Sequence, residues 1–160
     1  MIRYIFFIIT FLSIISCNEN VKELESVENK FNLTTEQLLE NDDYIKKIEL
    51  FYKEGKEGYF IGKDSITIYY KIFKQIKENK GAILISSGRT EAAIKYQELI
   101  FDLYKQGYSI YILDHRGQGL SGRIVIDSEM GYIDEFQFYI DDMKHFYTHY
   151  LYPNKHEKIY

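Results

Sequence analysis

Two polar loops carry the residue types that could do chemistry in this chain, and each follows a short apolar run. The first is Ser-Ser-Gly-Arg-Thr-Glu at 86–91, after the run that begins at Ala82. The second is Asp-His-Arg-Gly-Gln-Gly-Leu-Ser-Gly-Arg at 114–123, after the run from Tyr108 to Leu113. Hydroxyl, imidazole and carboxylate groups can act as nucleophiles or proton carriers, and glycines let backbone amides turn toward a ligand.

The second loop also matches the dinucleotide-binding pattern G-x-G-x-x-G through Gly117, Gly119 and Gly122. That pattern requires the glycines to lead straight into a helix whose N-terminus meets a pyrophosphate. Here the β-branched residues 124–126 follow, and the next helical pattern starts only near Ile133. We therefore expect this protein to bind no nucleotide, and we expect no other cofactor.

A serine nucleophile of an α/β enzyme needs G-x-S-x-G on a strand-to-helix turn, followed along the chain by an acid and a histidine. The segment around Ser121 misses this pattern because Arg123 stands where the second glycine is required. Ser65, Ser86 and Ser87 have no such turn around them. We therefore expect no catalytic residue of a triad within these 160 residues.

The histidines are weak candidates for metal or proton chemistry. His145 and His149 have the i, i+4 spacing of a metal pair, but the Glu of H-E-x-x-H and an obvious third ligand are missing. We expect both to lie on a solvated helix face and expect no metal site. His115 could act as a base, but at a strand end we expect it to be structural.

The loops are embedded in an alternation of strand and helix patterns that begins at Gly81. Short apolar runs predict buried strands, and apolar residues at helical spacing predict helices. Such alternation implies parallel strands joined by right-handed crossovers, which predicts an α/β fold. The expected elements are a strand at 82–86, a helix over 92–106 ended by Gly107, a strand at 108–113, a helix from Ile133 to Tyr150 ended by Pro153, and a strand beginning at 158–160.

Upstream, a hairpin and a helical region are expected. Residues 59–61 and 65–73 predict two strands joined by a turn at 62–64. Thr34 and Gln37 have the spacing of a capping box, which predicts a helix start at Thr34. Leu38, Ile45, Ile48 and Phe51 then form the apolar face of one helix or of two short ones.

The N-terminus has the pattern of an export signal. Arg3 is its only charge, and the apolar run at 5–15 is too short to span a bilayer as a helix. It ends in Ile-Ile-Ser-Cys at 14–17, which resembles a bacterial lipobox, with Cys17 as the acylated residue. We therefore expect a signal peptide at 1–16, a lipidated cysteine and polar tether at 17–33, and a domain at 34–160. A plain signal peptide or an uncleaved anchor is the alternative.

Composition limits the partners. Without residues 1–16, 19 basic and 24 acidic residues remain, a net charge of −5, and no Lys/Arg cluster suggests nucleic acid. Cys17 is the only cysteine, so no internal disulfide is possible. The expected location is the bacterial cell envelope, with membrane lipid held through acylated Cys17.

Residues 50–160 resemble the α/β-hydrolases of the lysophospholipase and monoacylglycerol-lipase branch. The string at 114–123 is the most specific part, and Gly-Arg-Thr-Glu at 88–91 and the hairpin support it. The resemblance implies that Arg89, with Gly88, supplies a backbone N–H to an oxyanion hole. The alternative is an ordinary strand-to-helix loop with Thr90 as N-cap. It also implies an active-site-supporting role for six residues of the second loop, namely Asp114, His115, Arg116, Gly117, Gly119 and Ser121.

In that family the nucleophile follows the strand that would begin near residue 158. The resemblance therefore implies that this chain is the N-terminal part of a membrane-anchored serine hydrolase of carboxylic esters such as lysophospholipids or monoacylglycerols. We expect the isolated chain to fold poorly, with an incomplete sheet, and to hydrolyse no ester. The alternative is a non-catalytic surface lipoprotein that keeps the scaffold.

Overall fold

The computed structural model describes residues 30–77, 80–127 and 130–160. They fall into two units, divided after Asn41, and each is described by itself. In the first unit, helix α2 (Glu36–Leu39) is capped by the Thr35 hydroxyl, which accepts a hydrogen bond from the Leu38 N–H at 3.4 Å. The helix start expected at Thr34 is therefore wrong by one residue. The expected signal peptide and Cys17 lie outside the described residues.

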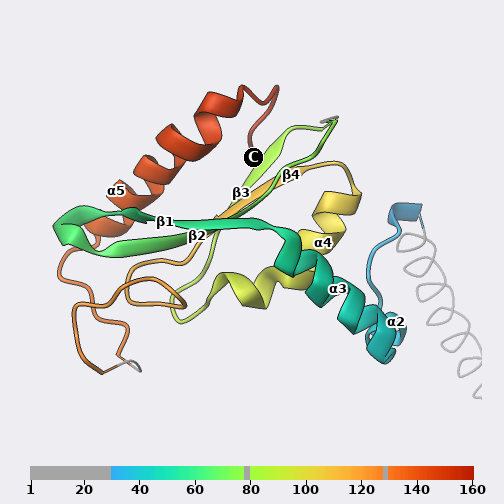
Figure 1. Cartoon of the computed structure of the whole chain (residues 1–160), viewed down its shortest axis with the longest axis horizontal. Coiled ribbons are helices and arrows are strands. Elements are labelled where there is room, and N and C mark those ends of the chain that lie inside the picture. Colours follow the sequence, from blue (N-terminus) through green and yellow to red (C-terminus); the bar gives the residue numbers. More distant parts are fainter. Residues whose placement is uncertain (1–29, 78–79, 128–129) are drawn as a thin grey trace, which may run out of the picture. The chain divides into compact units, whose positions relative to one another are not determined.

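The second unit, Asp42–Tyr160, is built on one mixed sheet in the order β1-β2-β4-β3 (Figure 1). Strands β1 (Lys56–Ile61) and β2 (Thr67–Phe73) form the expected hairpin, and β2 pairs antiparallel with β4 (Ser109–Leu113). Strand β3 (Ala82–Ser86) pairs parallel with β4. The expected segment at 158–160 adds a parallel bridge to the free edge of β3, with the Leu84 N–H donating to the Tyr160 carbonyl at 3.0 Å.

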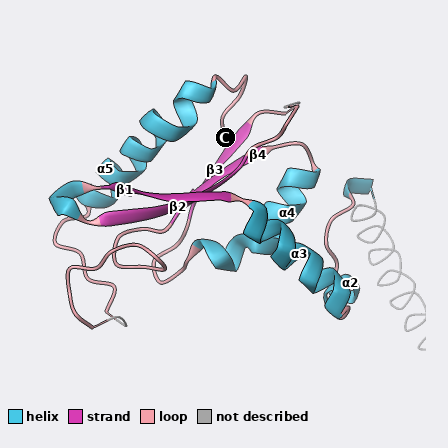
Figure 2. Cartoon of the chain, in the orientation of Figure 1, coloured by secondary structure: helices cyan, strands magenta, loops and turns pink. Residues whose placement is uncertain are grey.

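Helices cover both faces of this sheet, as expected for an α/β fold (Figure 2). Helices α3 (Asp42–Glu54) and α4 (Gln97–Lys105) pack on one face, and α5 (Gln137–Phe146) packs on the other. The apolar run of β4 is continuous because the strand is covered on both faces. Ile110 and Ile112 face α3 and α4, whereas Tyr111 and Leu113 face α5. All four are fully buried.

The strand predictions agree with the structure better than the helix boundaries do. A 3-10 turn (Ala93–Tyr96) precedes α4, and Gly107 ends that helix with a φ of +94°. Helix α5 begins at Gln137, not at Ile133, because the chain is irregular up to that point. It continues as a π-helical turn (Tyr147–Leu151), and Pro153 lies in a final 3-10 turn. Within the described residues, no helix combines the length and apolar character needed to cross a bilayer.

Candidate active-site scaffold

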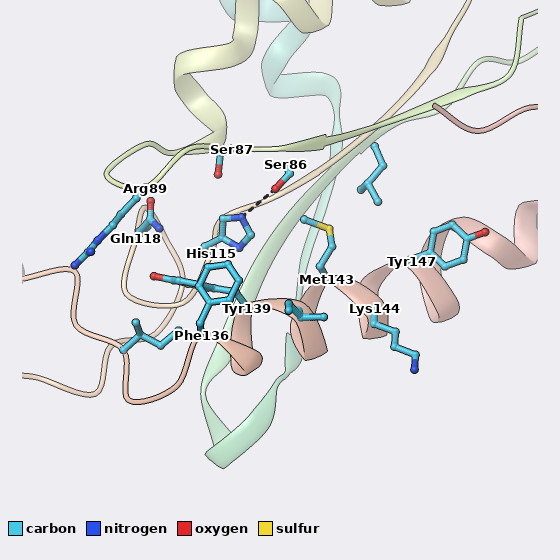
Figure 3. Close-up of a pocket in the computed structure, with 13 residues that line it drawn as sticks. Ser86, Ser87, Arg89, His115, Gln118, Phe136, Tyr139, Met143, Lys144 and Tyr147 are labelled. Carbon is cyan, nitrogen blue, oxygen red and sulfur yellow. Dashed lines mark hydrogen bonds between the residues drawn. The ribbon is translucent and has the colours of Figure 1, made fainter.

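The two polar loops meet at one end of the sheet, because β3 and β4 are parallel neighbours whose carboxyl ends lie together. Helix α5 and the loop before it close a cavity of about 720 Å³ against these strand ends (Figure 3). Its size is typical of small-molecule sites. The lining residues are Leu84, Ser86, Ser87, Arg89, His115, Gln118, Ile133, Phe136, Tyr139, Ile140, Met143, Lys144 and Tyr147.

The loop after β3 carries Arg89, which lines this cavity. The Gly88 N–H donates to the Glu91 carboxylate at 3.0 Å, and the Tyr96 hydroxyl donates to the same oxygen. These bonds hold the pKa of Glu91 below its usual value. The Arg89 side chain donates to the Gly131 carbonyl at 3.1 Å, but its backbone N–H donates to no acceptor among the described residues. A backbone amide without an internal acceptor can donate to a negatively charged oxygen.

Thr90 does not cap the following helix. Its φ of +72° places it in the left-handed region, and the cap position of the 3-10 turn is Ala92, which has no capping side chain. The N–H of Ala93 donates instead to Asp114 Oδ1 at 2.6 Å. The first N–H of the turn is therefore bonded by a carboxylate from the second loop, and the alternative in which Thr90 is the N-cap is wrong in that respect.

Asp114 joins the two loops. Its carboxylate is 1% exposed, and besides Ala93 it accepts from the Leu120 N–H at 2.8 Å. Gly119 (φ +48°) passes so close that a Cβ there would collide with this carboxylate. Gly117 (φ +77°) turns the chain, and its N–H donates to the Gly122 carbonyl at 2.9 Å. The loop thus closes on itself around a buried acid.

Ser121 is tied into the sheet. Its hydroxyl donates to the Asp114 carbonyl at 2.6 Å and accepts from the Tyr69 N–H of β2 at 2.8 Å. The side chain is 3% exposed and does not line the cavity. Ser121 therefore lies in position to hold the loop on β2.

Arg116 forms a buried ion pair with Asp142 of α5. Its Nε and one terminal nitrogen donate to the two carboxylate oxygens at 2.7 and 2.9 Å, and both side chains are 1% exposed. The same terminal nitrogen reaches the Lys63 carbonyl in the hairpin turn at 3.3 Å, and the guanidinium lies 4.9 Å from the Phe138 ring centroid. Arg116 thus fastens the loop to α5 and to the hairpin.

His115 faces the cavity beside Ser86 and Tyr139. Its Nε2 lies 3.4 Å from the Ser86 hydroxyl oxygen. Its ring packs edge-on against the Tyr139 ring, with the two ring centroids 5.0 Å apart. Burial lowers the pKa of His115, so the ring is neutral near pH 7. Its Nδ1 has no hydrogen-bond partner among the described residues, so no carboxylate orients the ring as a triad would.

His145 and His149 stack on one another with ring centroids 4.1 Å apart. The His145 ring also stacks on Phe60 at 4.7 Å, and it is only half-buried. Desolvation, together with the neighbouring His149, lowers the pKa of His145. No group of three or more possible metal ligands occurs in the described part of the chain.

The sequence patterns did not predict two residues of this site, Asp142 and Tyr139. Asp142 lies between the apolar positions Ile140 and Met143, so helical periodicity places it on a polar face. Tyr139, whose hydroxyl is buried without a partner among the described residues, carried no motif at all. Neither could be found without the packing of α5 on the second loop.

A family model described as "Serine aminopeptidase, S33" matches residues 77–160. Lysophospholipase L2 of Escherichia coli is 34% identical over 110 residues, which cover 69% of this chain and 32% of that protein. The probable lysophospholipase L2 of Haemophilus influenzae is 38% identical over 94 residues, or 58% of this chain and 29% of that protein. The chain therefore spans about a third of the length of the curated relatives it matches.

Two solved structures are also similar to it. A thioesterase domain from the curacin biosynthetic pathway has a TM-score of 0.47 at 16% identity, over 59% of this chain and 32% of that one. An α/β-hydrolase from a Medee basin deep-sea metagenome library has a TM-score of 0.44 at 20% identity, over 57% of this chain and 30% of that one. The family match covers more than half of the chain and agrees with the resemblance carried by the two loops. This chain belongs to the serine aminopeptidase S33 family, in the lysophospholipase-like branch of the α/β-hydrolases.

Proposed function

We propose that this chain is the N-terminal part of a membrane-anchored serine hydrolase that acts on carboxylic esters such as lysophospholipids or monoacylglycerols. The observation that carries the proposal is the backbone N–H of Arg89, which has no acceptor among the described residues and belongs to a residue that lines a mostly apolar cavity. An ester carbonyl placed there would gain a hydrogen bond as its oxygen becomes negative.

The reaction would be acyl transfer to a serine. The nucleophile attacks the ester carbon, the carbonyl oxygen becomes an oxyanion, and the alcohol leaves with a proton. Water then releases the fatty acid from the acyl-enzyme. In this proposal Arg89 supplies one oxyanion donor, and the serine, its acid, its histidine and a second amide come from outside these 160 residues. Loss of one such donor typically lowers kcat by about 10²–10³-fold.

Rigidity of the loop supports this role. A donor stabilises an oxyanion most when it is already in place and need not reorganise during the reaction. Here the loop of Arg89 is held at Gly88 by Glu91 and at Ala93 by the buried Asp114. We propose that Asp114, His115, Arg116, Gly117, Gly119 and Ser121 support the active site by fixing this geometry.

The anchor is a proposal from the sequence. Acylation of Cys17 would hold the protein on a membrane of the bacterial cell envelope, where single-chain lipids are accessible. Two or more acyl chains anchor a protein stably, whereas one anchors it only marginally. Mass spectrometry of the N-terminal peptide tests this directly, and an unmodified, uncleaved N-terminus would contradict it.

A second candidate is a non-catalytic surface lipoprotein that keeps the scaffold for binding. One observation favours it: His115 Nδ1 meets no carboxylate among the described residues. The two candidates differ in what the gene encodes after residue 160.

The deciding experiment reads the nucleotides downstream of codon 160 in all three frames. A G-x-S-x-G run followed by Asp and His supports the hydrolase. The extended chain should then release fatty acid from lysophosphatidylcholine or a monoacylglycerol, and alanine at the new serine should abolish release. The 160-residue chain serves as the inactive control. Absence of the motif in every frame, or an extended chain that folds without turnover on either ester, would contradict the proposal.

A further inference from the structure

Large apolar side chains are exposed in the segment that joins β4 to α5 and in the first turn of α5. Among the described residues, eighteen large apolar side chains are exposed, and six of them fall between positions 124 and 140. We call these six the apolar rim, which consists of Ile124, Ile126, Met130, Tyr132, Phe136 and Ile140. Single exposed apolar residues are normal on a protein surface, whereas a concentration of them marks an interaction site.

The loop that carries most of the rim is held by hydrogen bonds. The Arg89 side chain donates to the Gly131 carbonyl at 3.1 Å, which ties this loop to the loop after β3. Within it, the Met130 N–H donates to the Asp127 carbonyl at 3.2 Å, and the Tyr132 N–H donates to the Met130 carbonyl at 2.9 Å. In Figure 1 the segment, drawn in orange, extends away from the sheet. Its apolar side chains are therefore presented to solvent by a bonded loop.

The rim is continuous with the lining of the cavity beside it. Phe136 and Ile140 belong to both, because each lines the cavity and is also exposed to solvent. A protein partner seated on the rim would cover this side of the cavity. A bilayer surface would instead bring its own lipids there, and the proposed substrate is a membrane lipid. A lipid surface is therefore the partner that fits this position.

The charges of the segment indicate which kind of lipid surface fits. Residues 124–141 contain five acidic side chains and no basic one. This loop therefore lacks the basic residues that attract proteins to anionic lipid, and anionic lipid should repel it. Burial of apolar side chains is the remaining driving force, which favours a zwitterionic surface.

The proposed anchor would keep such a surface close to the rim. The 24 residues from 18 to 41 separate Cys17 from Asp42, where the second unit begins. A chain of that length spans at most about 85 Å even when fully extended. Acylation of Cys17 would thus hold the second unit within that distance of a bilayer and raise the effective concentration of lipid at the rim.

We propose that the apolar rim docks on a zwitterionic phospholipid surface, with Ile126, Met130 and Phe136 buried between the head groups and the upper acyl chains. The choice of partner rests on the proposed function and deepens it, because it names the surface by which the enzyme meets its substrate. Docking needs no nucleophile, so the 160-residue chain can be tested as it stands.

The test uses the fact that the chain contains no tryptophan. Ile126→Trp places a single tryptophan in the rim, and Ile76→Trp is the matched control, because both isoleucines are fully exposed. Ile76 follows β2, which is antiparallel to β4, so it lies at the opposite end of the sheet from the segment after β4. Tryptophan emission of both proteins is recorded on phosphatidylcholine vesicles whose acyl chains are either plain or brominated.

We expect Ile126→Trp to shift its emission to shorter wavelength on vesicles and to lose most of its intensity to brominated chains. Ile76→Trp should do neither. Any attachment through the apolar run at 5–15 is common to both proteins, so the difference between them reports on the rim. Phosphatidylglycerol added to the vesicles should reduce the quenching of Ile126→Trp, because the segment is acidic.

A second pair of substitutions tests the rim apart from the reporter position. Met130→Asp, added to Ile126→Trp, should lower the ratio of inserted to free tryptophan by at least about tenfold, because a charge replaces a buried apolar side chain. Leu99→Asp is the control and should leave the ratio unchanged, since Leu99 is exposed like Met130 but lies on α4, on the other face of the sheet. Each variant is first shown to keep the circular dichroism of the unsubstituted chain.

Equal quenching of the two tryptophans, or no quenching of either, would overturn the inference. So would short-wavelength emission of Ile126→Trp before vesicles are added, because a second copy of the chain would then cover the rim. If the 160-residue chain does not fold, the same variants are measured in the extended chain, where burial of the rim by the added part would equally overturn it.

The outcome is separable from that of the proposed function. Turnover of a short-chain ester in solution does not involve the rim, so turnover together with equal quenching would reject the docking surface and leave the hydrolase standing. Conversely, selective quenching at position 126 would stand even if the downstream frames encoded no serine motif.

Discussion

The Arg116–Asp142 pair is a buried ion pair of the scaffold, and Asp142→Asn tests its contribution to stability. The substitution keeps the size of the side chain but leaves the Arg116 cation buried without a counter-charge. Both side chains are 1% exposed, and two short hydrogen bonds of 2.7 and 2.9 Å join them. Removing one member of such a buried pair typically costs about 3–5 kcal/mol.

Urea unfolding of the full chain, followed by far-ultraviolet circular dichroism, measures this cost. A cooperative transition of the unsubstituted chain is the starting condition, and it would contradict the poor folding expected from the sequence. With a slope of about 1–3 kcal/mol per molar urea, the midpoint should fall by roughly 2 M. Asp141→Asn is the matched control, because Asp141 is exposed and its carboxylate accepts, among the described residues, one side-chain hydrogen bond, from Gln137 at 3.0 Å. We expect that control to change stability by less than about 0.5 kcal/mol.

Asp142→Asn could lower stability so far that the chain does not fold, and a second variant covers that case. Replacing both partners, with Arg116→Met and Asp142→Leu, removes the buried charges together. Apolar replacement of a buried pair is often neutral or stabilising, so the double variant should be more stable than Asp142→Asn alone. The reasoning is refuted if Asp142→Asn costs less than about 1 kcal/mol, or if the double variant is the less stable of the two.

Three further predictions concern the loop. Asp114→Asn should lower the free energy of unfolding by about 1–3 kcal/mol, measured in urea, because it weakens two buried bonds to backbone N–H groups. Gly119→Ala should lower the free energy of unfolding by about 1–3 kcal/mol, because φ is positive there and the new Cβ would clash with the Asp114 carboxylate. Gly131→Ala is the control: a Cβ at Gly131 meets no atom within 4 Å, so its free energy of unfolding should be near that of the unsubstituted chain. Burial lowers the pKa of His115, so the unfolded state binds more protons as pH falls below about 6.5. Stability should therefore drop between about pH 7 and pH 5, and His115→Gln should reduce that drop; an equal drop in both proteins would rule out this cause.

The sheet could be predicted because its signal is local. Continuous apolar runs mark β3 and β4, and the structure places both strands within one residue of the expected limits. Strand β4 is buried throughout, whereas Ile83 and Leu84 of β3 are half-buried and Ser86 is exposed. The short segment at 158–160 was also recognised, and it pairs with β3. The branch of the α/β-hydrolases followed from the loop at 114–123, and the family match agrees with it.

Helix starts were predicted less well because distant groups satisfy them. The N–H of Ala93 is bonded by Asp114, which is twenty-one residues away in sequence, so no local capping residue marks that start. Helix α5 begins without a side-chain cap, and Ile133 and Phe136 contribute to the cavity from the loop before it. The helical spacing of the apolar residues had predicted that both residues lie within the helix.

Sequence patterns could not identify the ion-pair partner of Arg116. Arg116 was expected to fix loop geometry, but its partner lies twenty-six residues further on. Nothing in a single sequence distinguishes Asp142 from its exposed neighbour Asp141. Only the packing of α5 against the second loop buries one and leaves the other in water.

The close approach of Gly119 to the Asp114 carboxylate also constrains how this loop can evolve. A side chain at position 119 would collide with that carboxylate, whereas loss of the carboxylate would leave two amides unpaired. Either change is therefore harmful when it arises first, even if both together were tolerated. Descendants of this gene should keep the pair intact or lose it as a whole, and an isolated change at one position would mark a copy no longer under selection for the geometry of this loop.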